Sequence, residues 1–154
     1  MIDVQTVSIV IASASVVAGV IYYALEIRHQ NRMRQTDLIM RLYSHYGSEE
    51  FQKVAERVNR GLKAEALSFH DYGEKYGYAE WIACGTFFEG IGILLYRKLI
   101  DISLVDDLFT APVNLAWDVM KVSIIEARKE FGQPTTFEWF EYLYNEMKKR
   151  QQRQ

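Results

Sequence analysis

The sequence predicts an all-helical protein in which one N-terminal transmembrane helix continues into a cytoplasmic bundle of about five helices. Three observations predict this architecture. An uncharged apolar run opens the chain, apolar residues recur at helical spacing in the remainder, and no segment shows sustained period-two alternation. With 154 residues, of which 49% are apolar and 25% charged, the chain has room for one folded domain of ordinary size and an anchor.

The apolar run, residues 4–25, carries no ionisable side chain other than those of Tyr22 and Tyr23. As a helix rising about 1.5 Å per residue it extends roughly 33 Å, which is enough to cross a hydrocarbon core of about 30 Å. The two tyrosines lie at one end, where interfacial aromatic residues belong. We therefore expect a transmembrane anchor in residues 1–27, a helical cytoplasmic domain in residues 28–147 and a basic tail in residues 148–154.

A cleaved signal peptide is the alternative interpretation of the run. Such a peptide needs a positively charged segment before the apolar stretch, and the one charged side chain there is that of Asp3. The small residues Ala12, Ser13 and Ala14 resemble a cleavage site but lie in the middle of the run. Retention as an anchor is therefore favoured.

The charged residues that flank the run predict its orientation. Arg28, Arg32 and Arg34 follow the run, with Arg41 beyond them, whereas Asp3 precedes it. Because arginine-rich flanks stay in the cytoplasm, we expect a single-pass protein of the cell (inner) membrane with its N-terminus outside and its C-terminal domain in the cytoplasm. An alternative to a role in topology alone is that these arginines and the basic tail contact anionic headgroups, where each charge near the surface contributes about 1 kcal/mol.

A row of small residues follows one face of the predicted span. Ser8, Ala12, Ser15 and Gly19 recur at spacings of four, three and four, and Tyr22 extends the row. Small residues let helix backbones approach closely in lipid, so the row predicts association with a second copy or with another membrane protein. The same row is also compatible with the lining of a narrow pore in a ring of copies, although the span contains no ring of charge.

Capping residues predict where the helices after the anchor begin. Gly47 ends the first long helix and Ser48 can cap the next, with two glutamates in its first turn. Ser68 begins a looser capping pattern. Ser103 is a third start, of a short helix that should end near Thr110, which can itself cap the following helix.

Proline and glycine set the remaining boundaries. Pro112 is tolerated in the first turn of a helix that begins at Thr110, and Gly132 with Pro134 should end that helix. Thr135 and Glu138 then have the spacing of a capping box, in which the hydroxyl accepts one free backbone N–H and the glutamate another.

The most apolar segment of the domain, from Trp81 to Tyr96, is predicted to be a buried core helix rather than a second span. It is 16 residues long and holds Glu89 near its middle, where burial in lipid is unfavourable. Gly85, Gly90 and Gly92 mark places where a neighbouring helix can pack closely.

Glu89 is the most informative single residue, because apolar neighbours on both sides predict that it is partly buried. A buried carboxylate needs a partner, and Arg128 and Arg97 are the candidates for a structural ion pair. A functional acid in a cleft or along an ion path is the alternative.

The remaining residues offer little chemistry. The net charge of −2 excludes a dedicated nucleic-acid binder, and the single cysteine, Cys84, lies in an apolar stretch typical of a buried small residue. His29, His45 and His70 are too scattered for a metal motif. We therefore expect no cofactor, no bound metal and no enzymatic activity; an enzyme with dispersed catalytic residues would need a deep polar pocket containing Glu89.

Several stretches in the second half of the chain resemble an uncharacterised prokaryotic family of short proteins with one N-terminal span and a helical domain of unknown function. The resemblance rests on residues 87–92, residues 96–101, Trp117, Arg128 and residues 137–143, in that order and spacing. It implies the anchor and the helical fold, and it adds no activity.

Together these observations predict a membrane-tethered interaction or scaffold module whose partners are the lipid bilayer and either further copies of the chain or another membrane protein. The alternative is a homo-oligomeric ion channel with the N-terminal helix lining the pore.

Overall fold

In the computed structural model, which describes residues 3–152 apart from the side chain of Thr6, every regular element of the described range is helical. The elements are α1 (Val4–Tyr46), α2 (Glu49–Asn59), the π-helical turn η1 (Arg60–Ala64), α3 (Phe69–Tyr76), α4 (Ala79–Tyr96), α5 (Ile102–Glu130) and α6 (Glu138–Gln151). The all-helical fold class predicted from the sequence is confirmed.

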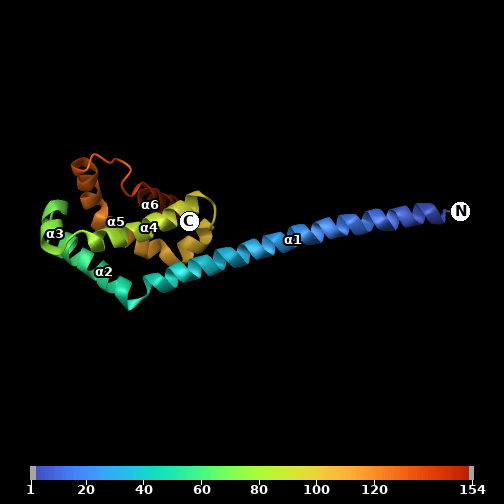
Figure 1. Ribbon diagram of the computed structural model, residues 1–154, viewed down its shortest axis with the longest axis horizontal. Helices are drawn as coiled ribbons and strands as arrows, with labels where there is room; N and C mark the ends of the chain where they lie inside the picture. The colour runs from blue at the N-terminus through green and yellow to red at the C-terminus, as the bar shows by residue number, and fades with distance from the viewer. Residues whose placement is uncertain (1–2, 153–154) are drawn as a thin grey trace. The chain divides into compact units, whose positions relative to one another are not determined.

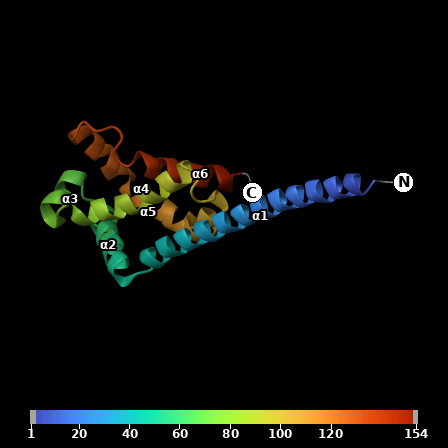
Figure 2. The same cartoon turned by 45° about the vertical axis from the view of Figure 1, so that its right-hand side comes forward.

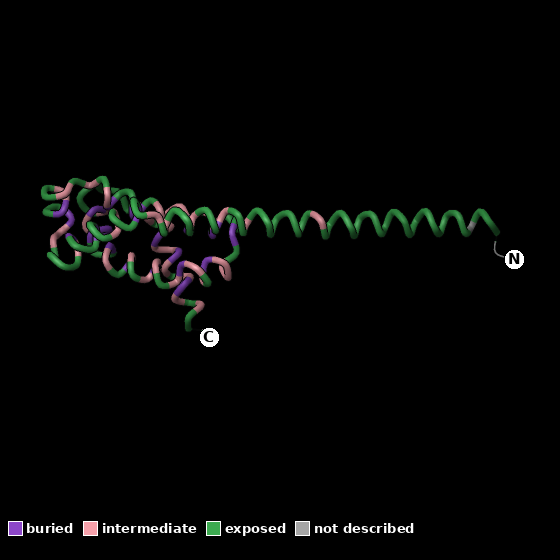
Figure 3. The backbone as a smooth tube through the Cα atoms, turned by 90° about the horizontal axis from the view of Figure 1, so that it is seen from below, coloured by how far each residue is buried: buried purple, intermediate pink, exposed green. Residues whose placement is uncertain are grey.

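The chain divides into two compact units, Met1–Asp37 and Leu38–Gln154, which we call the N-terminal segment and the helical domain. The N-terminal segment consists of the first part of α1. Its described side chains from Val4 to Leu25 are all exposed, and Figure 3 shows this stretch in the colour of exposed residues. The last turns of α1, from Leu38 to Tyr46, belong to the helical domain, where Ile39 is buried.

The core of the helical domain is built around α4. In two views α4 runs through the middle of this unit beside α5 and α6 (Figures 1 and 2), and it also packs against α2. Phe88 of α4 stacks on Phe140 of α6 with ring centroids 4.9 Å apart, and Trp117 of α5 meets Phe140 edge to face at 5.1 Å. These aromatic contacts bury large apolar areas where three helices meet.

Two of the predicted helix caps are confirmed. The hydroxyl of Ser48 accepts a hydrogen bond from the backbone N–H of Phe51 at 3.2 Å, and that of Ser68 accepts one from Asp71 at 3.1 Å. Each bond satisfies an N–H group that has no partner within its own helix.

Helix α5 corrects the prediction of two helices that meet at Thr110. It begins after Asp101, whose carboxylate accepts the backbone N–H of Ser103 at 2.8 Å, and it continues through Pro112 to Glu130. The hydroxyl of Thr110 donates to the carbonyl of Asp106 one turn back and caps nothing. A proline inside a helix removes one backbone hydrogen bond. Here the apolar face stays buried on both sides of it, at Phe109 and Val113, so packing outweighs the local break.

The capping box predicted at Thr135 and Glu138 is also wrong. Helix α6 begins at Glu138, and the residue before it, Phe137, has left-handed backbone angles and provides no side-chain cap. The ring of Phe137 packs against Trp81 with centroids 5.0 Å apart. The packing of this partly buried ring holds the backbone in a conformation that the box does not allow.

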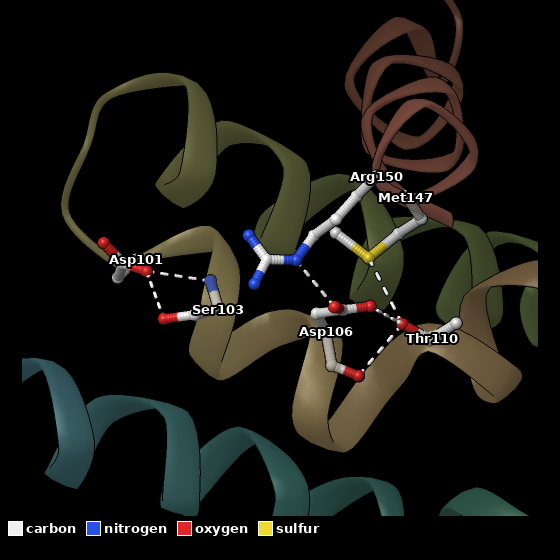
Figure 4. A network of polar contacts seen from close by, with 6 residues as sticks. All are labelled: Asp101, Ser103, Asp106, Thr110, Met147 and Arg150. Carbon is white, nitrogen blue, oxygen red and sulfur yellow. Dashed lines mark hydrogen bonds and ion pairs between the residues drawn. The ribbon is translucent and has the colours of Figure 1, made fainter. Parts of the chain in front are cut away.

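The far end of α6 is attached to α5. The guanidinium of Arg150 donates to the Asp106 carboxylate at 2.6 Å, and Thr110 donates to the other oxygen of that carboxylate at 2.5 Å (Figure 4). Met147 of α6 lies over Thr110, with 3.6 Å between its sulfur and the hydroxyl. Residues 148–151, which the sequence places in a basic tail, therefore continue α6.

Two glycines let α6 approach the backbone of α4. A Cβ at Gly92 would lie 2.0 Å from the carbonyl oxygen of Trp139, and one at Gly85 would lie 2.3 Å from the ring of Phe137. Gly90 faces open space, because nothing lies within 4 Å of its Cβ position. Close packing at Gly85 and Gly92 follows the sequence prediction, and Gly90 has no such role.

These environments predict opposite effects for two alanine substitutions. Gly92→Ala should lower the free energy of unfolding by about 1–3 kcal/mol, because the backbone of α6 must move away. Gly90→Ala should raise it by about 0.5–1 kcal/mol, because alanine favours a helix and meets nothing. Denaturant unfolding of the detergent-solubilised chain, followed by tryptophan fluorescence, measures both. Equal effects of the two substitutions would contradict the close contact at Gly92.

Candidate functional site

The carboxylate of Glu89 lies at the start of α6. One of its oxygens accepts a hydrogen bond from the backbone N–H of Phe140 at 2.7 Å, and the N–H of Trp139 is a second donor. Glu89 therefore caps α6 from α4, across 51 residues of sequence. The first N–H groups of a helix have no partner of their own and carry the positive end of its dipole, so a carboxylate is well placed there.

Three residues on one face of α4 build this contact. Gly85, Glu89 and Gly92 are spaced by four and three residues, so they follow one another along the helix. The two glycines give α6 room, and Glu89 between them supplies the acceptor that the left-handed Phe137 does not provide. We call these three residues, with the backbone of Trp139 and Phe140, the α4–α6 clamp.

Opposing influences act on the pKa of Glu89. Burial raises the pKa above its ordinary value, while the two backbone N–H donors and the more distant Arg128 lower it less strongly. The carboxylate faces α6 and does not line the main groove of the domain. Because its bonds are made to the backbone of a neighbouring helix, this geometry supports a structural role.

The arginines expected to pair with Glu89 have other contacts. Arg128 donates to the carbonyl of Thr136 at 2.9 Å and to the carboxylate of Glu141 at 2.7 Å. Arg97 is exposed at the C-terminal end of α4, two turns beyond Glu89. The predicted ion pair is thus replaced by backbone capping, because the N-terminus of α6 reaches the carboxylate and Arg128 fixes the loop before α6.

Sequence reasoning missed a second glutamate of the same kind. Glu126 of α5 accepts a hydrogen bond from the backbone N–H of Phe69, the first residue of α3, at 2.7 Å. The sequence did not distinguish Glu126 from an ordinary surface glutamate, because glutamates are common on helix surfaces. Both α3 and α6 thus begin on a carboxylate supplied by a core helix.

The residues of the predicted seam lie in the N-terminal segment. Because α1 is helical throughout this part, Ser8, Ala12, Ser15, Gly19 and Tyr22 fall along one face. The hydroxyls of Ser8 and Ser15 donate to the carbonyls of Val4 and Ile11, one turn earlier. The basic residues that follow the apolar run, Arg28, Arg32 and Arg34, are exposed on the same helix.

The helical domain contains an open groove of about 420 Å³ between α2 and α5, with α4 as its floor. Small side chains from the three helices meet there, namely Ala55 of α2, Cys84 of α4, and Pro112 and Ala116 of α5. Larger apolar residues, Phe51, Val58, Phe88, Val119 and Met120, complete the walls. We call this feature the α2–α5 groove; its size lies within the range of about 300–1,000 Å³ usual for small-molecule sites.

The polar side chains of the groove are Tyr46 of α1 and, along its edge on α2 and η1, Gln52, Glu56, Asn59 and Lys63. On the floor, burial raises the pKa of the Cys84 thiol to about 12, so the thiol stays protonated at neutral pH. Within residues 3–152 no group of three or more His, Cys, Asp or Glu side chains is placed to hold a metal ion. The groove is therefore suited to binding an apolar group.

Comparison with protein families gives one match. The chain fits a domain of unknown function, DUF4760, over residues 12–147. The chain belongs to this family. The match confirms the resemblance to an uncharacterised family, and it includes most of the apolar run as well as the helices of the clamp and the groove. No curated protein and no solved structure matches the chain.

The clamp predicts which residue caps α6. Glu89→Ala should lower the free energy of unfolding by about 1–3 kcal/mol, because it leaves buried N–H groups of Trp139 and Phe140 without an acceptor. Thr135→Ala, which would disrupt the capping box predicted from the sequence, should change it by less than about 0.5 kcal/mol. Chemical denaturation followed by tryptophan fluorescence tests both. A larger loss for Thr135→Ala than for Glu89→Ala would contradict the clamp.

Proposed function

We propose that this chain is a single-span membrane protein whose helical domain is a cytoplasmic interaction module. The observation that carries the proposal is the exposure of every described side chain from Val4 to Leu25, a predominantly apolar stretch of α1 that contains no charged residue. A helix that is apolar on all sides needs either protein or lipid around it. A bilayer supplies that environment over the whole length of the run.

Helices α4 and α5 are also long and apolar enough to cross a membrane by length and composition. We propose that both remain in the helical domain. Each buries large side chains in the core, such as Phe88 of α4 and Phe109 of α5. Their polar groups bond within the domain, as Trp81 does to Ser123 at 2.8 Å, and a lipid environment adds nothing to those bonds.

The orientation in this proposal follows from charge. Arg28, Arg32 and Arg34 are exposed directly after the apolar run, and arginine-rich flanks are retained on the cytoplasmic side. The helical domain that follows them is then cytoplasmic, and the N-terminus lies outside the inner membrane.

Recognition rather than catalysis is supported by the surface of the helical domain. Leu115 lines the α2–α5 groove, and α5 also exposes Val122 and Ile125 outside it on the same side of the helix. Exposed apolar surface of this kind is typical of contact with a partner.

Association of the span is supported by the seam itself, because small residues such as Ser8, Ala12, Ser15 and Gly19 let helix backbones approach closely in lipid. The seam serines already donate within their own helix, and they need neither a partner hydroxyl nor pore water. Helix–helix contact therefore accounts for the seam without a channel.

The anchor is tested with paired arginines. Ile11→Arg with Val16→Arg should release the protein from membranes washed at alkaline pH, because each charge at the centre of a span costs about 2.5–3.5 kcal/mol on insertion scales. The matched control, Val122→Arg with Ile125→Arg on the exposed side of α5, should leave it membrane-bound. Release by the α5 pair, or retention of the α1 pair, would contradict a single span in α1.

The association is tested by the mass of the detergent-solubilised chain, measured by light scattering with bound detergent subtracted. The unmodified chain should form a small oligomer that Gly19→Leu dissociates, because a large side chain separates the packed backbones. Val17→Leu, away from the seam, should leave the oligomer intact. A monomeric unmodified chain would exclude self-association and leave another membrane protein as the partner.

A further inference from the structure

We propose that the α2–α5 groove is a binding site for a free long-chain fatty acid. The inference concerns the helical domain alone and goes beyond the proposed tether. It rests on the apolar interior of the groove and on Lys63 at its edge, which forms no ion pair with the residues that the structure describes.

The interior of the groove favours an apolar ligand. Ala55, Cys84, Pro112 and Ala116 leave the space open because their side chains are short, and the surrounding walls are aliphatic or aromatic. An apolar space exposed to water is unfavourable, and an alkyl chain that fills it removes that surface from solvent. The body of the ligand is therefore expected to be hydrocarbon.

The polar edge of the groove determines which head group the ligand carries. Gln52, Ala55, Asn59 and Lys63 follow one another at intervals of three or four residues along α2 and η1. The charge of Glu56 is matched by Arg60, with 2.9 Å between carboxylate and guanidinium. Among residues 3–152 Lys63 forms no ion pair, so the edge carries one unbalanced positive charge. A single carboxylate complements it, and Asn59 beside it offers an amide donor.

The experiment uses a fatty acid with a diazirine in its alkyl chain, added to the full-length protein in phosphatidylcholine nanodiscs and activated by light. Mass spectrometry then locates the label. We expect it on peptides covering residues 51–63, 84–88 and 112–120. If the protein proves to need no membrane, the same labelling is done in buffer, so failure of the tether does not remove the test.

Two variants test the charge of Lys63 and the open volume of the groove separately. Lys63→Glu should reduce labelling of these peptides by about tenfold, because it replaces the attraction with repulsion. Ala116→Trp should reduce it as strongly by filling the groove, with circular dichroism confirming the fold. Lys53→Glu is the matched control on the same helix; Lys53 pairs with Glu49 at 2.6 Å outside the groove, and labelling should be unchanged.

Three results would overturn the proposal. Label confined to residues 4–25 would show partition into the bilayer only. Labelling of the groove that is insensitive to both Lys63→Glu and Ala116→Trp would show unspecific contact. Equal labelling by a phosphatidylcholine with the same diazirine chain would show that the groove takes bilayer lipid and not the free acid.

Discussion

The arrangement of the helical domain depends on one charged acceptor, the carboxylate of Glu89 on α4. By bonding the backbone of Phe140 it fixes where α6 begins, and Gly85 and Gly92 on the same face allow the approach. The other end of α6 is held by the bond from Arg150 to Asp106 of α5. Glu126 of α5 accepts the backbone N–H of Phe69 at the start of α3 in the same way. Carboxylates of the two core helices thus hold the outer helices at their N-termini, where the helix dipole favours negative charge.

The packing of α6 against one face of α4 also accounts for the groove. One face of α4 is occupied by α6 at backbone distance, so α2 and α5 meet α4 on its remaining surface. There the small side chain of Cys84 lies between the bulky Trp81 and Phe88, and Ala116 of α5 is equally short. Apolar interiors are normally filled to the density of organic crystals. A groove lined by short residues from three helices is therefore a feature of this sequence rather than of helix packing in general.

Hydrogen bonds between residues close in sequence were predictable, whereas contacts between residues of different helices were not. Ser48 and Ser68 bond to groups three residues away, so their caps follow from spacing alone. The burial of Glu89 followed from its apolar neighbours, but its partner is a backbone group on another helix, and no side-chain pattern identifies such a partner. The predictions made at Pro112 and Thr135 were wrong for a related reason. Each satisfies a local rule that two aromatic side chains, the buried Phe109 and the partly buried Phe137, override through contacts remote in sequence.

The polar groups of the helical domain are engaged in ways that underlie our proposal of recognition. A catalytic acid or nucleophile needs an open site and a pKa suited to proton transfer. Glu89 and Glu126 instead use their carboxylates on backbone N–H groups, and burial keeps the thiol of Cys84 protonated. The α2–α5 groove is mainly apolar inside and presents Lys63 at its edge. Apolar contact and one charge are sufficient to select the ligand that we propose for this groove.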